Sequence, residues 1–176
     1  NNNYLNGLEV HSKGTILASG ITYTYKVKVK SKTKTVTVAL PSGITARNNG
    51  GYGVFIDNSE AAAAQAVTLN GTNTFNNNAS SGLEVYSKGA IALNNVDAHN
   101  NGSGGGGDGV HLRNWQAATP QPVTLTGYNN FSNNYNNGLQ VISKGAIKAY
   151  NLRSNNNGDG AELYNTDSGA ALPQNV

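Results

Sequence analysis

The sequence predicts an all-β chain that winds into a parallel β-solenoid, and three features support this prediction. Six short phrases begin with glycine and then alternate inward and outward positions, as a strand with one buried face must. Runs of Asn and Gly recur at intervals between the apolar strands, where they suit the corners of a regular structure. Outside its insertions the chain repeats every 22 residues or so, and periods of this size are typical of solenoids.

The six phrases define strands that we expect to stack on one side of the solenoid. They are GLEVHS from Gly7, GVFIDN from Gly53, GLEVYS from Gly82, GVHLRN from Gly109, GLQVIS from Gly138 and GAELYN from Gly160. Alternation directs one apolar pair of each phrase inward: Leu8/Val10, Val54/Ile56, Leu83/Val85, Val110/Leu112, Leu139/Val141 and Ala161/Leu163. One coil cannot bury its apolar face alone, but about six coils stacked ~4.8 Å apart form a continuous core roughly 29 Å long.

The spacing of these glycines indicates two kinds of coil. Successive glycines are 46, 29, 27, 29 and 22 residues apart, and the irregularity includes an insertion between Ile21 and Ile44 and a glycine-rich loop at 104–107. Turns with Ser-Lys-Gly alternate with turns that begin with Asn, so the larger repeating unit is about 56 residues. Every coil of one kind therefore needs the same corner.

The residue five positions after each glycine is always Ser or Asn. The column contains Ser12, Asn58, Ser87, Asn114, Ser143 and Asn165. Side chains of this kind stacked one coil apart can form a hydrogen-bonded ladder along the axis. We therefore expect an asparagine and serine ladder at this corner.

With these repeats the chain resembles the right-handed parallel β-helix superfamily, whose pectin-lyase-like repeats occur in polysaccharide-active enzymes and in large bacterial surface proteins. The resemblance covers nearly the whole chain except the insertion. It implies a right-handed β-helix of about six coils, most like the repeat regions of surface proteins. It does not choose between the two functions, because one scaffold serves both.

Residues 22–43 are expected to form a β-hairpin inserted into a single solenoid domain that spans 1–176. Tyr23, Tyr25, Val27 and Val29 alternate with Thr and Lys, and Val36, Val38 and Leu40 repeat the pattern, with Ser31 and Lys32 at the expected turn. A two-stranded hairpin is only marginally stable alone, so its apolar face needs cover. Tyr23, Tyr25, Val27, Val36 and Val38 would pack on the chain's own solenoid, on another copy or on another protein.

Charge and composition exclude several classes of function. The net charge is +3, but five lysines (Lys26, Lys28, Lys30, Lys32 and Lys34) lie in the hairpin, and seven basic residues face nine acids elsewhere. Five lysines without arginine on a nearly neutral body make a weak nucleic-acid footprint, so no nucleic-acid partner is expected. The chain has no Cys, which excludes disulfides and thiol catalysis. No apolar stretch approaches the length of a membrane span, so no membrane insertion is expected.

Candidate catalytic acids lie on the outward face of the stacked strands. Asp57 would lie diagonally between Glu9 and Glu84, which belong to the coils on either side. The spacing of residues and strands in a sheet puts Asp57 about 8 Å from each of them, and this distance falls within the range of the carboxyl pair of an inverting glycosidase. His111 and Arg113 lie nearby. Single, evenly spread acids are also ordinary on an exposed sheet, so we assign no catalytic residue and expect no metal and no cofactor. We interpret GGGGDG, ending at Gly109, as a flexible loop.

The two ends of the chain predict self-association. The first residues match those before the other strand glycines, and LPQNV at the end matches AAQAV and TPQPV, so both ends fall inside the repeat without a polar cap. Open β-edges are templates for pairing with another chain, here through Asn1, Tyr4, Leu5, Leu172 and Val176. We expect a structural, non-enzymatic module of an extracellular filament or cell-surface adhesin stalk, stacking on other copies or on flanking repeats. The alternative is a β-helix that binds or cleaves polysaccharide through Glu9, Asp57 and Glu84, with glycans as partners.

Overall fold

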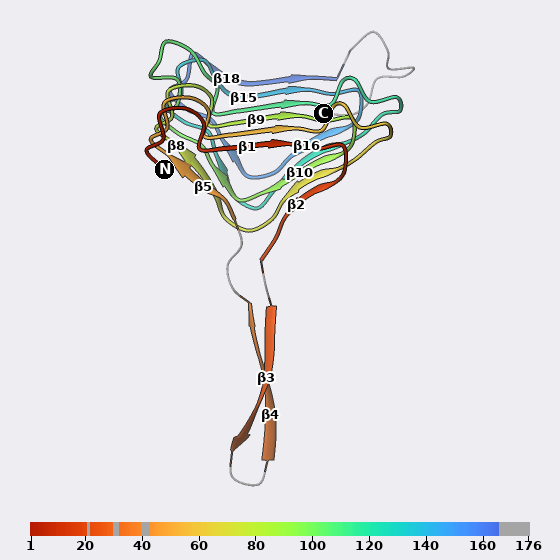
Figure 1. Cartoon of the computed structure of the whole chain (residues 1–176). Coiled ribbons are helices and arrows are strands. Elements are labelled where there is room, and N and C mark those ends of the chain that lie inside the picture. The colour runs from red at the N-terminus through yellow and green to blue at the C-terminus, as the bar shows by residue number, and fades with distance from the viewer. Residues whose placement is uncertain (21, 30–31, 40–42, 166–176) are drawn as a thin grey trace.

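The computed structural model describes residues 1–20, 22–29, 32–39 and 43–165, and these residues form an all-β structure. Figure 1 shows short strands wound into a stack of coils, with one long hairpin leaving the stack. The fold is the predicted right-handed parallel β-helix, built from three parallel sheets. Among the described residues, no helix has the length and hydropathy needed to cross a membrane.

Sheet 1 takes one strand from each of six coils, which we number 1 to 6 by these strands. In order across the sheet they are β1 (Leu8–His11), β6 (Val54–Asp57), β9 (Leu83–Tyr86), β12 (Val110–Arg113), β15 (Asn137–Ile142) and β18 (Asp159–Tyr164). All neighbouring strands are parallel. Coil 1 and coil 6 therefore form the two ends of the described solenoid.

Each of coils 1 to 5 then supplies one strand to sheet 2 and one to sheet 3. Sheet 2 contains β2 (Ile16–Ala18), β7 (Val67–Leu69), β10 (Ile91–Asn94), β13 (Val123–Thr126) and β16 (Ile147–Ala149). Sheet 3 contains β5 (Thr45–Arg47), β8 (Asn73–Asn76), β11 (Val96–Asp97), β14 (Asn129–Asn130) and β17 (Leu152–Arg153). The three sheets enclose one core that runs along the axis.

The predicted register of sheet 1 is confirmed at every coil. Leu8 pairs with Val54, and the series continues through Leu83, Val110, Leu139 and Ala161. The inward pairs of coils 2 to 5 are at most 1% exposed, whereas Leu8 in coil 1 is 37% exposed. The end pairs are less buried because each has a neighbouring coil on one side within the described residues.

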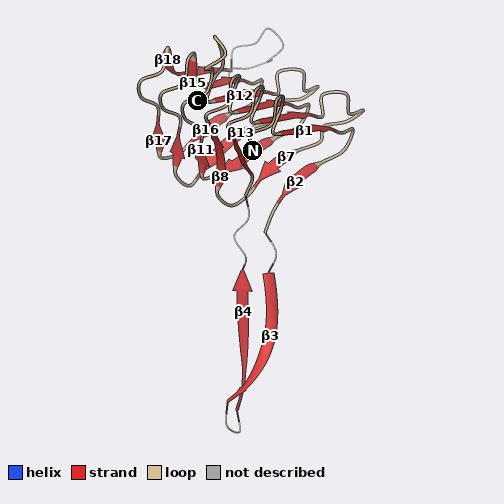
Figure 2. Ribbon diagram, turned by 60° about the vertical axis from the view of Figure 1, so that its left-hand side comes forward, coloured by secondary structure: helices blue, strands red, loops and turns tan. Residues whose placement is uncertain are grey.

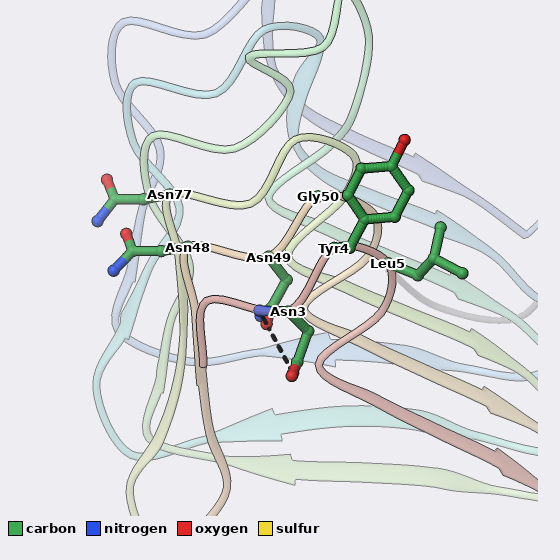
Figure 3. Close-up of a pocket in the computed structure, with 7 residues that line it drawn as sticks. All are labelled: Asn3, Tyr4, Leu5, Asn48, Asn49, Gly50 and Asn77. Carbon is green, nitrogen blue, oxygen red and sulfur yellow. Dashed lines mark hydrogen bonds between the residues drawn. The ribbon is translucent and has the colours of Figure 1, made fainter.

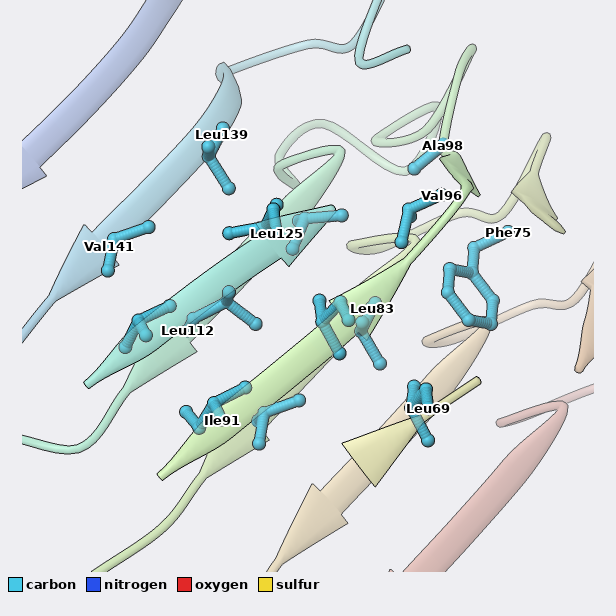
Figure 4. Packing of buried hydrophobic residues seen from close by; sticks show 14 of the residues in the cluster. Leu69, Phe75, Leu83, Ile91, Val96, Ala98, Leu112, Leu125, Leu139 and Val141 are labelled. Atoms are coloured by element: carbon cyan, nitrogen blue, oxygen red, sulfur yellow. The ribbon is translucent and has the colours of Figure 1, made fainter. Parts of the chain in front are cut away.

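The core combines these pairs with apolar residues from sheets 2 and 3. Leu69, Ile91 and Leu125 of sheet 2 face inward, as Figure 4 shows beside Leu83 and Leu112 of sheet 1. Phe75 in β8 and Phe131 directly after β14 add two fully buried rings to the core on the side of sheet 3. The strands are short, yet the stacked side chains form one continuous apolar column.

The insertion forms the predicted hairpin, with β3 (Thr22–Val29) antiparallel to β4 (Lys32–Ala39). Tyr23 lies opposite Val38 and Tyr25 opposite Val36 in the register. Because Val29 pairs with Lys32, the connection is 30–31, which lies outside the described residues, and Lys32 belongs to the strand rather than to the turn. Figures 1 and 2 show the hairpin extending away from the solenoid, so it does not fold back onto its own coils.

Candidate functional site

The turn between sheets 1 and 2 connects each coil to the coil beneath it. In the Ser-Lys-Gly turn of coil 3, the Ser87 Oγ accepts the N–H of Gly89 (3.0 Å) and donates to the carbonyl of Gln65 in coil 2 (3.1 Å). Coil 5 repeats both bonds with its own Ser-Lys-Gly turn. The serine therefore closes its own turn and holds the coil below.

The lysine and glycine of this turn also contact the coil beneath. Lys88 Nζ donates to the carbonyl of Ala61 (3.2 Å), and Lys144 Nζ repeats this bond with Ala117 (3.2 Å). A Cβ on Gly89 would overlap the backbone carbonyl of Gln65, so only glycine allows the two coils to approach this closely. All three residues of the Ser-Lys-Gly turn thus contact the coil beneath, whose own turn begins with Asn (an Asn-type coil). This explains why the Ser-Lys-Gly phrase recurs in alternate coils.

The turns that begin with Asn also bind the coil beneath them. Asn58 Nδ2 donates to the carbonyls of Gly14 in coil 1 (3.3 Å) and Gln65 (2.9 Å), and Asn114 makes the same pair of bonds in coil 4. The predicted column is buried, except that Ser12 in coil 1 is half-exposed. Its interior members bind turn carbonyls rather than each other, so the ladder expected in this column was wrongly placed.

An asparagine ladder does exist, at the corner between sheets 3 and 1. Each Nδ2 donates to the Oδ1 of the next ladder residue at 2.7–3.1 Å, in the order Asn3, Asn49, Asn78, Asn101, Asn134 and Asn157. Each Oδ1 from Asn49 onward also accepts the backbone N–H of the preceding ladder residue. The residue before each one is an asparagine with φ between 54° and 60°, a left-handed conformation that asparagine tolerates. The ladder has a direction, with donors pointing toward coil 6.

The residues predicted for self-association at the N-terminal end lie beside coil 1. Asn1 Oδ1 accepts the N–H of Arg47 in β5 (2.8 Å), while Tyr4 is 91% and Leu5 68% exposed. Tyr4 and Leu5 line a hollow of about 560 Å³ together with Asn49 and its neighbours, and Figure 3 shows these lining residues. Leu172 and Val176 lie outside the described residues.

The three candidate catalytic acids share the outward face of sheet 1, but each has a different partner. Glu9 accepts from Asn6 Nδ2 (2.9 Å) and lies 2.8 Å from His11 Nε2, and these hydrogen bonds lower the pKa of Glu9, that of His11 most. Asp57 accepts the N–H of Ser59 in its own turn (2.8 Å).

Glu84, the third acid, accepts the hydroxyl of Tyr86 (2.5 Å). The register places Phe55 between Glu9 and Glu84, so these two acids lie two coils apart.

A more compact acidic cluster surrounds His111. Its Nδ1 lies 3.8 Å from the Glu84 carboxylate and 3.6 Å from that of Asp108, both buried. Burial raises the pKa of Asp108, although the N–H of Asn137 donates to it (3.0 Å). Asp108 ends the glycine-rich loop that we expected to be flexible, and its burial shows that the loop is anchored at this end.

The His111 ring is held neutral despite these acids. Burial, followed by the charge of Arg113, lowers the pKa of His111 to about 4. The two carboxylates lie beyond hydrogen-bond distance of Nδ1, and burial has the larger effect on the ring. Burial and the neighbouring Glu84 raise the pKa of Tyr86 to about 12. His111 Nε2 and Arg113 Nε are buried without a hydrogen-bond partner in the described structure.

In chemical terms this cluster offers two buried carboxyl groups beside a neutral imidazole. Enzymes that hydrolyse glycosides use a pair of carboxyl groups in different environments. Within the described ranges, no group of three or more His, Asp or Glu side chains is arranged to hold a metal ion.

The chain has no match among the protein families, the curated proteins or the solved structures with which it was compared. Its parallel β-helix fold therefore follows from its own sheets, registers and ladder.

Proposed function

We propose that the chain is a structural, non-enzymatic β-solenoid module that stacks end to end in an extracellular or cell-surface filament or adhesin stalk. The observation that supports this most directly is the open apolar column at the ends of the described solenoid. Leu8 of coil 1 is 37% exposed and Leu163 of coil 6 is half-buried, although equivalent residues of the interior coils are fully buried. A further coil at either end would bury them.

The backbone at the two ends supports the same proposal. Among the described residues, β1 and β18 each pair with one neighbour in sheet 1, which leaves a row of backbone donors and acceptors along the outer edge. Such an edge is a template for another strand. Because the two ends differ, the contact is head to tail, and a head-to-tail contact that does not close produces filaments.

The relation to pectin-lyase-like repeats belongs to this proposal. The three-sheet coil, the short strands and the asparagine corners support it, and the resemblance to the repeat regions of large bacterial surface proteins supports a location outside the cell. Flanking repeats of the same chain would stack on these edges in a stalk as another copy would in a filament.

Sedimentation and electron microscopy across a concentration series test the proposal. We expect unbranched filaments with an axial repeat near six coils, which the spacing between strands converts to roughly 29 Å. A chain that stays monomeric at every concentration would contradict self-assembly.

A second candidate function is the binding or cleavage of a polysaccharide on the outward face of sheet 1. Tyr52, Phe55, Tyr86 and His111 form a row of rings 5.5–6.4 Å apart, beside the acidic cluster. Aromatic rings with a few polar groups are typical of ligand sites. Turnover of a glycan panel by the wild type, lost in Glu84→Gln or Asp57→Asn with the fold intact, would support this candidate against the structural one.

A further inference from the structure

We propose that Asn70 is a site of spontaneous deamidation, at which the side-chain amide is lost as ammonia and a carboxylate takes its place. The chain has six Asn-Gly pairs, which begin at Asn6, Asn49, Asn70, Asn101, Asn137 and Asn157. Glycine has no side chain to hinder a reaction between its backbone nitrogen and the asparagine before it. The contacts described below protect five of these pairs and leave Asn70-Gly71 accessible. The reaction is independent of the proposed self-association.

The reaction needs only the chain and water. The Gly71 nitrogen attacks Cγ of Asn70, so that an N–Cγ bond forms and the Cγ–Nδ2 bond breaks. Nδ2 leaves as ammonia and takes with it the proton of the Gly71 N–H. Water then opens the resulting cyclic imide at either carbonyl. One product is an ordinary aspartate, and the other is isoaspartate, whose backbone passes through the former side chain and has one more carbon.

At Asn70 both reacting groups are free of hydrogen bonds within the described structure. Asn70 lies at the corner between β7 and β8, where it is exposed, and neither its Oδ1 nor its Nδ2 has a partner among the described residues. The Gly71 N–H likewise has no acceptor in that part of the chain. Gly71 has a φ of 82°, which glycine adopts without strain. The pair can therefore react without first breaking a hydrogen bond of the attacking nitrogen or of the amide.

Three of the other pairs are protected at the attacking nitrogen. In each of them the glycine N–H donates to a backbone carbonyl of a neighbouring coil, at 2.8–3.0 Å. These glycines are Gly7, Gly50 and Gly102. Such a hydrogen bond has to open before the nitrogen can attack, and local opening inside a packed solenoid is costly.

The side-chain amides of the other five pairs are also held in place. Both Oδ1 and Nδ2 are hydrogen-bonded in three members of the asparagine ladder: Asn49, Asn101 and Asn157. Asn6 Oδ1 accepts the N–H of Tyr52 (2.9 Å), and its Nδ2 donates to Glu9 (2.9 Å). Asn137 is 8% exposed within β15, so water has little access to it. Each of these pairs has to open locally before an imide can form.

The modified corner would lie beside the base of the hairpin. Asn70 N–H donates to the carbonyl of Ala18 in β2 (2.9 Å), the last strand before the hairpin. Thr74 N–H donates to the carbonyl of Ile44 (2.8 Å), which follows the hairpin. Figure 1 shows the hairpin leaving the coils between β2 and β5. Isoaspartate would add a backbone carbon between these two anchors, and either product would lower the net charge of +3 by one. The modified fraction would increase with the age of the protein.

Mass spectrometry of the whole chain after incubation in mildly alkaline buffer tests the site. Peptide fragmentation locates each conversion of amide to acid, and enzymatic isoaspartyl methylation identifies isoaspartate. We expect Asn70 to react at least about 10-fold faster than each of the other five asparagines, because those pairs must first open and ~1.4 kcal/mol of opening slows a reaction tenfold. Cation-exchange chromatography should show a less basic form that accumulates far more slowly in Asn70→Gln, whose longer side chain has to close a larger ring.

The chain unfolded in guanidinium chloride provides the matched control. All six pairs should react at similar rates there, because they are the same dipeptide without the hydrogen bonds of the fold. If Asn70 reacts faster by the same factor in the unfolded chain, its reactivity comes from its sequence neighbours and the proposal is wrong. The proposal is equally wrong if Asn70 stays intact in the folded chain, or if another pair reacts there as fast as Asn70 does.

Discussion

Asn101 Nδ2 and the Asn101 backbone N–H both donate to Oδ1 of Asn134, each at 3.0 Å. One side-chain oxygen thus connects coil 3 to coil 4 by two hydrogen bonds inside the structure. Asn101 also receives the equivalent bonds from Asn78 and caps the carbonyl of Phe75. Buried polar groups of this kind are stabilising only while all their partners remain.

Replacing Asn101 by Ala should lower the free energy of unfolding by about 3 kcal/mol, because two donors of Asn78 and one acceptor of Phe75 lose their buried partner. Urea unfolding measures the change. The control is Asn70→Ala, since Asn70 is exposed and its side chain has no hydrogen bond among the described residues; a change within about 0.5 kcal/mol is expected there. Equal losses in the two variants would contradict a structural role for the ladder.

Replacing Gly89 by Ala should destabilise the monomer by about 2 kcal/mol or more, because the new Cβ overlaps the Gln65 carbonyl and the coils must separate. Gly14→Ala, with open space below it, should be neutral or stabilising by up to about 1 kcal/mol. Both are measured by urea unfolding at protein concentrations where the chain is monomeric. A Gly14→Ala variant as unstable as Gly89→Ala would show that this turn is constrained within the single chain.

The neutral His111 predicts a stability loss in mild acid. The pKa of His111 is lowered to about 4 in the folded chain, against about 6.5 when unfolded. Between these values the unfolded chain binds a proton and the folded chain does not, so stability falls as pH falls through this window, by about 2 to 3 kcal/mol.

His111→Gln should flatten this pH dependence, as measured by urea unfolding at several pH values. The groups facing the ring are Glu84, Asp108 and Arg113. Because the pKa of Asp108 is raised by burial, Asp108 acts in the opposite direction, and the difference between wild type and variant isolates the histidine. An unchanged slope would mean that His111 is protonated in the fold.

Replacing residues 21–42 by a short Gly-Ser linker should leave the stability of the solenoid within about 1 kcal/mol of the wild type. The reason is that β3 and β4 pair with each other and extend away from the coils. Thermal unfolding of the shortened chain measures this. A drop of several kcal/mol would mean that the hairpin covers part of the solenoid in solution.

The strands and their register could be predicted from the sequence because period-two alternation and a leading glycine mark each strand of sheet 1. Leu8, Val54 and Leu83 each follow a strand glycine directly in the sequence, and they occupy paired positions in sheet 1. The correct ladder was missed because asparagine is present at every corner. Which asparagine points inward depends on the left-handed residue before it, such as Asn100 before Asn101. A usable signal was present, since Asn3, Asn49 and Asn78 each lie four residues before a strand glycine.

The acidic cluster was only partly predictable. Glu84 and His111 were placed on the outward face by alternation, and the structure brings them together. Asp108 was not included, because it follows four glycines in a segment with no strand pattern. Its position is set by the Asn137 N–H and by the burial of the loop end, which are tertiary effects.

Because the two kinds of turn alternate, each coil fits only on a coil of the other kind. A duplication or deletion of a single coil would place two Ser-Lys-Gly turns in contact. The upper turn would then lack the two carbonyl acceptors of an Asn-type coil, which are those of Gln65 for Ser87 and of Ala61 for Lys88 in coil 3. A change of two coils, about 56 residues, keeps every interface intact. Solenoids built on this pattern should therefore vary in length by even numbers of coils.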